Sequence, residues 1–179
     1  MEKDKLLLHC CCAPCSTIPY KRLNEKYSVT LFFFNPNIYP AAEYLKRAQE
    51  IKNYASLKGI PYLENIEEYK FWQQGISGLE NEKEGGKRCS FCYEYRLQRT
   101  AEVAAGNKFD WFTTTLSISP HKNAEMINKL GVQIGENMAL KYLQSDFKKM
   151  DGFKLSAAES AKEGFYRQNY CGCEYSIRL

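Results

Sequence analysis

Short apolar runs alternate with longer amphipathic stretches through the first third of the chain. Apolar, β-branched and aromatic residues cluster at 6–8, 28–34 and 60–63, and each run has the length of a buried strand. Between these runs, the spacing of apolar residues predicts helices over 17–27 and 41–57. A strand–helix–strand–helix–strand order implies right-handed crossovers, so the pattern predicts a parallel sheet.

The turn after the first apolar run carries the most distinctive chemistry of the chain. Four cysteines lie within six positions of it: Cys10, Cys11, Cys12 and Cys15. We expect Ser16 to cap the helix that follows, with Pro19 in its first turn. The carboxyl end of a strand is where open α/β sheets bind ligands. A helix N-terminus also favours the thiolate, which is the form of cysteine that binds metal.

The rest of the chain is predicted to resume the alternation after an interruption. Residues 64–88 are charged and rich in glycine, and we interpret them as an inserted segment with one short helix. The later expected elements are a helix at 89–105, a strand at 109–115, a helix that begins with Ser119 as its cap and Pro120 as its first residue, a short element of undetermined type within 133–142, and a helical centre at 156–163. The chain 1–179 is therefore predicted to be one α/β domain, a three-layer sandwich with an insertion and a cysteine-bearing tail.

Composition narrows the class of protein. The chain has 179 residues, 14% of them aromatic, which is enough for a packed core and argues against disorder. A formal net charge of +4 permits a nucleic-acid partner without requiring one. No apolar run reaches the length of a membrane span, and the first residues do not form a secretory signal. We therefore expect a cytoplasmic protein with no membrane partner.

Eight cysteines in a cytoplasmic protein indicate metal binding or redox chemistry rather than disulfides. They fall into three groups, and one zinc ion or one iron–sulfur cluster uses four protein ligands. We infer one four-thiolate centre with a second metal or redox site beside it. The count favours iron over a zinc ribbon, which would leave four cysteines idle, while the Cys89-x-x-Cys92 pair alone also suits a redox-active dithiol.

The spacing of the cysteines suggests how they divide. Cys89 and Cys92 fall on one face of a helix start, and Cys171 and Cys173 share a face if their backbone is extended. Adjacent cysteines in extended backbone point in divergent directions, so we expect neighbours to serve two different centres. We predict a cluster held by Cys89, Cys92 and Cys15 with Cys11 or Cys12. Cys171 and Cys173, with Cys12 in the same shell, are predicted to help hold the second centre or to shuttle electrons to it.

Other candidate functional residues are less distinctive. His121, Asp146 and Tyr39 are candidate proton donors, whereas His9 lies in an apolar strand and is expected to be a core residue. Basic residues beside the cysteine groups are candidate phosphate contacts: Lys87, Arg88, Lys148 and Lys149. Residues around Cys171 could clamp a base or simply pack the end of the core: Tyr166, Arg167, Tyr170 and Tyr175.

Five ordered blocks resemble those of the QueH family, the cobalamin-independent epoxyqueuosine reductases. The blocks are LHCCCAPCS, FFNPNI, RCSFCYEYRL, FTTTLSISPHKN and RQNYCGCEYS. The resemblance runs over residues 6–176 and implies a HUP-like (Rossmann-like) sandwich, a [4Fe–4S] cluster and a neighbouring mononuclear iron. It also implies reductive deoxygenation of epoxyqueuosine at the wobble position, in the anticodon loop of tRNA, with electrons from an unidentified donor. Cys10 is the cysteine least expected to be a ligand.

The resemblance and the residues together assign catalytic roles to Cys12, Cys171 and Cys173 and a proton-donor role to Asp146 or His121. Two alternative functions belong to other classes of protein. One is a zinc-stabilised RNA-binding module without catalysis, and the other is an iron–sulfur enzyme that acts on a small molecule. The colour of the anaerobically purified protein distinguishes the first alternative, because thiolate-bound iron absorbs visible light and zinc does not.

Overall fold

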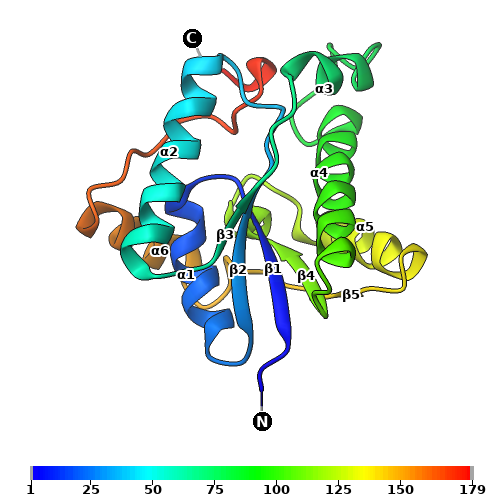
Figure 1. Ribbon diagram of the computed structural model, residues 1–179. Coiled ribbons are helices and arrows are strands. Elements are labelled where there is room, and N and C mark those ends of the chain that lie inside the picture. The colour runs from blue at the N-terminus through cyan, green and yellow to red at the C-terminus, as the bar shows by residue number, and fades with distance from the viewer. Residues whose placement is uncertain (1, 178–179) are drawn as a thin grey trace.

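The computed structural model describes residues 2–177, which are built around one parallel sheet (Figure 1). The sheet has five strands in the order β3-β2-β1-β4-β5, and every neighbouring pair is parallel. The strands are β1 (Lys5–Cys10), β2 (Ser28–Phe33), β3 (Tyr62–Glu64), β4 (Trp111–Thr114) and β5 (Lys141–Tyr142). The predicted parallel sheet is confirmed, and its carboxyl edge faces upward in Figure 1.

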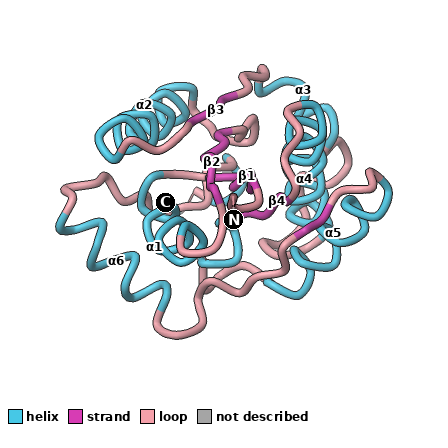
Figure 2. Tube along the Cα trace, turned by 60° about the horizontal axis from the view of Figure 1, so that its bottom comes forward, coloured by secondary structure: helices cyan, strands magenta, loops and turns pink. Residues whose placement is uncertain are grey.

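Helices cover both faces of the sheet. They are α1 (Ala13–Asn24), α2 (Ala41–Lys58), α3 (Tyr69–Gly75), α4 (Lys87–Gly106), α5 (Ala124–Asn137) and α6 (Gly152–Lys162). Figure 2 shows α1, α2 and α6 on one side of the strands and α4 and α5 on the other. Successive leucines of β1 pack into two hydrophobic cores, one on each face of the sheet. Leu6 and Leu8 share one core with Ile51 of α2, and Leu7 shares the other with Leu97 of α4. The predicted three-layer sandwich is therefore confirmed.

The first helix begins earlier than predicted. Cys12, not Ser16, is the N-cap of α1, and Pro14 is the second residue of the helix. Proline fits there because its fixed φ suits a helix start and its missing N–H would have no helical partner. The Ser16 hydroxyl donates to the Cys12 carbonyl at 2.7 Å from inside the first turn. Two of the cysteines, Cys12 and Cys15, are thereby brought to the helix terminus itself.

The helix predicted to start at Ser119 also begins elsewhere. The strand β4 leads into a 3₁₀ helix, η1 (Thr115–Ile118), and Asn123 caps α5 by accepting from the Met126 N–H at 3.1 Å. Ser119 instead closes a local turn, because its hydroxyl accepts from the His121 N–H at 3.3 Å. The undetermined element within 133–142 is the end of α5 followed by β5.

The inserted segment and the end of the tail form short elements above the carboxyl edge of the sheet, whereas α6, earlier in the tail, lies beside α1. The short helix expected in the insertion is α3, and the tail contains α6 and a 3₁₀ helix, η2 (Glu174–Ser176). Figure 1 shows α3 and the end of the tail beside each other above this edge, where the Tyr69 hydroxyl of α3 donates to Glu174 of η2 at 2.7 Å. Among the helices of residues 2–177, none is long and apolar enough to cross a membrane.

Gly152, the first residue of α6, tolerates no side chain. A Cβ atom at this position would overlap the backbone carbonyl of Phe147. Replacement of Gly152 by alanine should lower the free energy of unfolding by about 3 kcal/mol, the upper end of the range for overpacking. Urea unfolding followed by circular dichroism measures this. Gly106→Ala is the matched control, because a Cβ there meets nothing within 4 Å and a helical glycine gains from alanine.

Candidate active site

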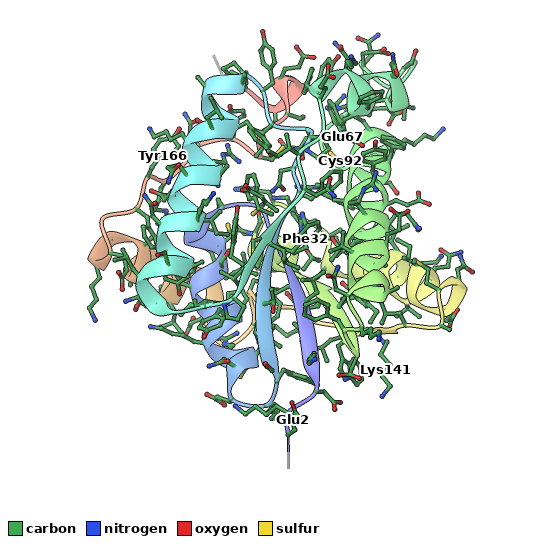
Figure 3. All side chains as sticks on the ribbon, in the orientation of Figure 1. Glu2, Phe32, Glu67, Cys92, Lys141 and Tyr166 are labelled. Atoms are coloured by element: carbon green, nitrogen blue, oxygen red, sulfur yellow. The ribbon has the colours of Figure 1, made fainter. Side chains whose placement is uncertain are left out.

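A cavity of about 270 Å³ opens at the carboxyl edge of the sheet, between α1, the start of α4 and the tail. Six cysteines line it: Cys11, Cys15, Cys89, Cys92, Cys171 and Cys173. Figure 3 labels Cys92 at the upper end of α4, on the side where the strands end. The three cysteine groups, up to 162 positions apart in sequence (173 − 11), therefore meet in one place, as the predicted site requires.

The first group is a compact thiol triad. The sulfur atoms of Cys11, Cys12 and Cys15 all lie within 4.8 Å of one another, and those of Cys11 and Cys12 are 3.8 Å apart. Neighbouring thiols were expected to diverge, and this expectation was wrong. The strand ends at Cys10 and the chain bends at Cys11, so side chains no longer alternate. A 3.8 Å separation matches the edge of a tetrahedron whose metal–sulfur bonds are about 2.3 Å.

The triad shares its protons unequally. Hydrogen bonds from the thiols of Cys12 and Cys15 hold the pKa of Cys11 well below its usual range, with help from the nearby charges of Lys122 and Arg96. The same interaction with Cys11 raises the pKa of Cys12 to about 12 and also raises that of Cys15. Three cysteines close together at a helix N-terminus, one of them with a lowered pKa, form an arrangement suited to metal binding.

The second group lies at the start of α4. Gly86 is the N-cap, so Cys89 and Cys92 fall in the first two turns, and both face the cavity. The predicted shared face of this pair is confirmed. Cys89 Sγ accepts from the Gly85 N–H at 3.2 Å. Cys92 packs against Trp72 of α3 in a small apolar cluster that also contains Cys173.

The tail brings the third group over the cavity. The guanidinium of Arg47, 1% exposed, donates to the carbonyl oxygens of Cys171 at 3.1 Å and Tyr170 at 3.4 Å. The Gly172 carbonyl accepts from the Tyr39 N–H at 2.8 Å. Farther along the tail, Gln168 Nε2 donates to Cys12 Sγ at 3.0 Å. The tail that carries Cys171 and Cys173 thus also contacts the triad.

Gly172 gives the tail its turn between the two cysteines. Its φ of +122° is one that side chains rarely adopt, and a Cβ there would press on Ile38 and Arg47. The backbone is therefore not the extended segment expected from the sequence, yet both thiols reach the cavity. A hydrogen bond from Cys173 keeps the pKa of Cys171 well below its usual range. The same hydrogen bond, and to a smaller extent burial, raises the pKa of Cys173.

Two cations that the sequence analysis did not single out face the thiols. Arg96 is 3% exposed and donates to the Cys92 carbonyl at 3.3 Å and to Asn35 Oδ1 at 3.1 Å, without an ion pair to any carboxylate of residues 2–177. Lys122 lines the same cavity. Burial works against both charges, but thiolates at Cys11 and Cys171 raise the pKa of Lys122. Because an unpaired buried cation is costly, this arrangement is suited to an anionic occupant.

A sequence signal for Arg96 did exist. It lies one helical turn after Cys92, so the spacing alone places its side chain on the face of α4 that carries the thiols. Arg47 has no such signal, because its partners are backbone carbonyls of the tail 123 and 124 positions away.

The candidate proton donors are separated by the fold. His121 is exposed at the mouth of the cavity. Asp146 pairs with Lys148 at 3.3 Å, and neither Asp146 nor Tyr39 is among the described residues that line the cavity. His9 is a core residue, as predicted: it bonds Thr114 and the Phe34 carbonyl, and burial lowers its pKa to about 3.

The basic residues expected to contact phosphate differ in their exposure to solvent. Arg88 is 3% exposed and donates to the carbonyl oxygens of Leu79, Glu80 and Glu82, so it holds the inserted segment rather than facing solvent. Lys148 is held by carbonyl oxygens at positions 117 and 122 and by the ion pair with residue 146. Lys87 and Lys149 are exposed.

Comparison with known proteins identifies the family. Residues 6–178 match the family model described as "Epoxyqueuosine reductase QueH". A protein of that name from Streptococcus pyogenes serotype M1 is 39% identical over 99% of this chain and 72% of its own length. One from Thermotoga maritima is 38% identical over 96% of this chain and 90% of its own length.

Solved structures resemble the fold at low sequence identity. The U34-tRNA thiolase NcsA from Methanococcus maripaludis, determined with its [4Fe–4S] cluster, has a TM-score of 0.59 at 16% identity, over 99% of this chain and 63% of that one. A protein described as a "predicted subunit of tRNA methyltransferase" from Methanocaldococcus jannaschii has a TM-score of 0.58 at 11% identity, over 85% of this chain and 74% of that one. These likenesses concern the Rossmann-like sandwich, whereas the family match spans the motifs that build the cavity. The chain belongs to the QueH family of epoxyqueuosine reductases.

Proposed function

We propose that the protein reduces epoxyqueuosine to queuosine at the wobble position of tRNA and that cysteine-bound iron supports the reaction. The observation that carries this proposal is the cavity in which six thiols meet at the carboxyl edge of the sheet. Its place at the ends of the strands is where α/β sheets bind substrates. The reaction belongs in the cytoplasm, where tRNA is modified.

The donor set fits iron held by thiolates. Soft thiolate ligands select iron–sulfur clusters and zinc. The cations beside the thiols offset the negative charge of a thiolate-bound centre of either kind. In the proposal Cys89, Cys92 and Cys15 hold a [4Fe–4S] cluster together with Cys11 or Cys12, and the tail cysteines hold a mononuclear iron near Cys12. When bound, the cluster supplies electrons one at a time and the single iron supplies a Lewis acid.

The side chains of the cavity supply the rest of the chemistry. Conversion of the epoxide to an alkene breaks two C–O bonds, consumes two electrons and two protons and releases the oxygen as water. His121 at the mouth is the candidate donor that we carry forward, because it lines the cavity and is exposed to solvent. Lys122 and Arg96 provide positive charge where the oxygen leaves.

Two experiments test the function. Transfer RNA from a deletion strain should lack queuosine and contain epoxyqueuosine, and the purified, reduced protein should convert that tRNA in vitro. An unchanged queuosine content would overturn the proposal. A colourless protein with one bound zinc would instead favour an RNA-binding module, for which the compact triad is a suitable zinc site.

Phosphate contacts at the carboxyl edge are expected to contribute to tRNA binding. Lys149 is exposed just before α6, whose Phe153 lines the cavity. Lys149→Ala should flatten the slope of log affinity against log salt by about one unit, because one fewer phosphate is neutralised. Lys26→Ala is the control, since this lysine is exposed at the opposite, amino edge of the sheet, between α1 and β2. Equal slopes for both variants would show that Lys149 is only a solvating charge.

A further inference from the structure

We propose that Phe153 and Arg167 form a stacking platform for the anticodon-loop base next to the nucleoside in the cavity. The proposal rests on the proposed function and names how the same site engages its RNA. Phe153 was not a candidate functional residue in the sequence, and Arg167 was grouped there with the tail tyrosines instead.

Phe153 is a large apolar side chain left open to solvent at the cavity. It lies in the first turn of α6, is 41% exposed and lines the mouth. The guanidinium carbon of Arg167, from the tail, is 5.7 Å from the centre of the phenyl ring. An aromatic face beside an exposed guanidinium is how proteins bind unpaired RNA bases, which stack on both.

Other aromatic side chains around the cavity are engaged elsewhere. Trp72 and Tyr93 line it but are buried, at 0% and 5% exposed. Of the tail tyrosines that the sequence favoured, Tyr166 and Tyr175 do not line the cavity, and Tyr170 is half-buried with its hydroxyl donating to the Tyr39 carbonyl oxygen. Of the described aromatic residues that line the cavity, Phe153 is thus the one with an exposed ring.

The platform is held in a fixed position. Arg22 of α1 donates to the carbonyl oxygens of Phe147, Lys149 and Met150, at 2.9–3.2 Å, and so fastens the segment that leads into α6. One helical turn after Phe153, the Ser156 hydroxyl donates to the Pro14 carbonyl oxygen of α1. Because the ring is already held by a fixed helix, little conformational entropy is lost when a base stacks on it.

The size of the cavity places neighbouring nucleotides outside it. At about 270 Å³ it lies near the lower end of ligand pockets, which are roughly 300–1,000 Å³. With metal bound to the thiols the remaining space admits no more than one modified base, so the nucleotides on either side of that base must lie at the rim. The rim residues Phe153, Arg167 and His121 are exposed there, and Arg167 adds charge that suits the RNA backbone.

Binding of a fluorescent anticodon stem–loop to the reduced, iron-loaded protein tests the platform. Phe153→Ala should weaken the affinity about tenfold, the loss typical of one stacked base, and Phe153→Trp should retain it. Leu155→Ala is the matched control, because Leu155 is on the same helix, is 47% exposed and does not line the cavity. Iron content, measured on every variant, should equal that of the wild type.

A second arm identifies the base. A stem–loop with an abasic site beside the wobble position should bind the wild type about tenfold more weakly, and should bind Phe153→Ala with no further loss. Independent, additive losses would overturn the platform, as would unchanged affinity of Phe153→Ala or loss of its iron. Turnover is measured separately: a wild type that binds the loop but never reduces epoxyqueuosine tRNA refutes the proposed function, while the abasic comparison still decides the platform.

Discussion

Replacement of Cys89 by alanine should abolish the visible absorbance of the anaerobically purified protein. Cys89 lies in the first turn of α4, where the Gly85 N–H donates to its sulfur and its side chain faces the cavity. If it is one of the four ligands of a cluster, its loss leaves three, and the cluster should be lost on purification. Iron analysis and the absorption spectrum measure the effect, and turnover should fall to background.

Cys10→Ala provides the control for this prediction. Its thiol is also buried, but it donates to the Leu8 carbonyl at 3.2 Å and packs in the core on the side of α1 and α2, away from the cavity. This variant should keep its iron and its spectrum, at the modest stability cost of a small buried group. A Cys89→Ala protein with full iron content would remove Cys89 from the ligand set.

The fold was predictable because its strands carry strong local signals. Leu6, Leu7 and Leu8 are buried on both faces, so a continuous apolar run was the correct signature of a central parallel strand. Helix starts were harder, because several residues nearby can cap. Ser16 and Ser119 are both good caps by composition, yet Pro14 and Asn123 determine the observed starts of α1 and α5.

For the site, the sequence predicted that the cysteine groups meet, but it predicted neither the geometry of the thiols nor the other residues around them. The motifs placed all three cysteine groups at one edge of the sheet, and the structure brings them together. Sequence spacing contains neither the bend at Cys11 nor the left-handed Gly172, which lies where the tail contacts Tyr39 and Arg47. Arg47 and Phe153 were missed for a related reason, since their roles depend on segments more than a hundred residues away or on exposure at a cavity mouth.

The tail cysteines should separate the two proposed metal centres. Cys171 and Cys173 reach the cavity on a segment that Arg47 fastens through backbone carbonyls, and the same segment contacts Cys12 through Gln168. Cys171→Ala and Cys173→Ala should each keep the cluster spectrum, lose the mononuclear iron and lose turnover of epoxyqueuosine tRNA. Iron content, absorption and turnover, all measured on one preparation, check the three expectations together.

The contrasting outcomes have distinct structural meanings. Cys173 shares an apolar cluster with Cys92, so loss of the whole spectrum in these variants would assign the tail thiols to the [4Fe–4S] centre instead. Normal turnover in both would leave them as structural thiols that close the tail onto the sheet. Asn169→Ala controls for disturbance of the tail, because Asn169 is exposed on the same segment and carries no thiol, and its iron content should match the wild type. If Asn169→Ala also lost iron, the cause would be displacement of the tail rather than removal of a ligand.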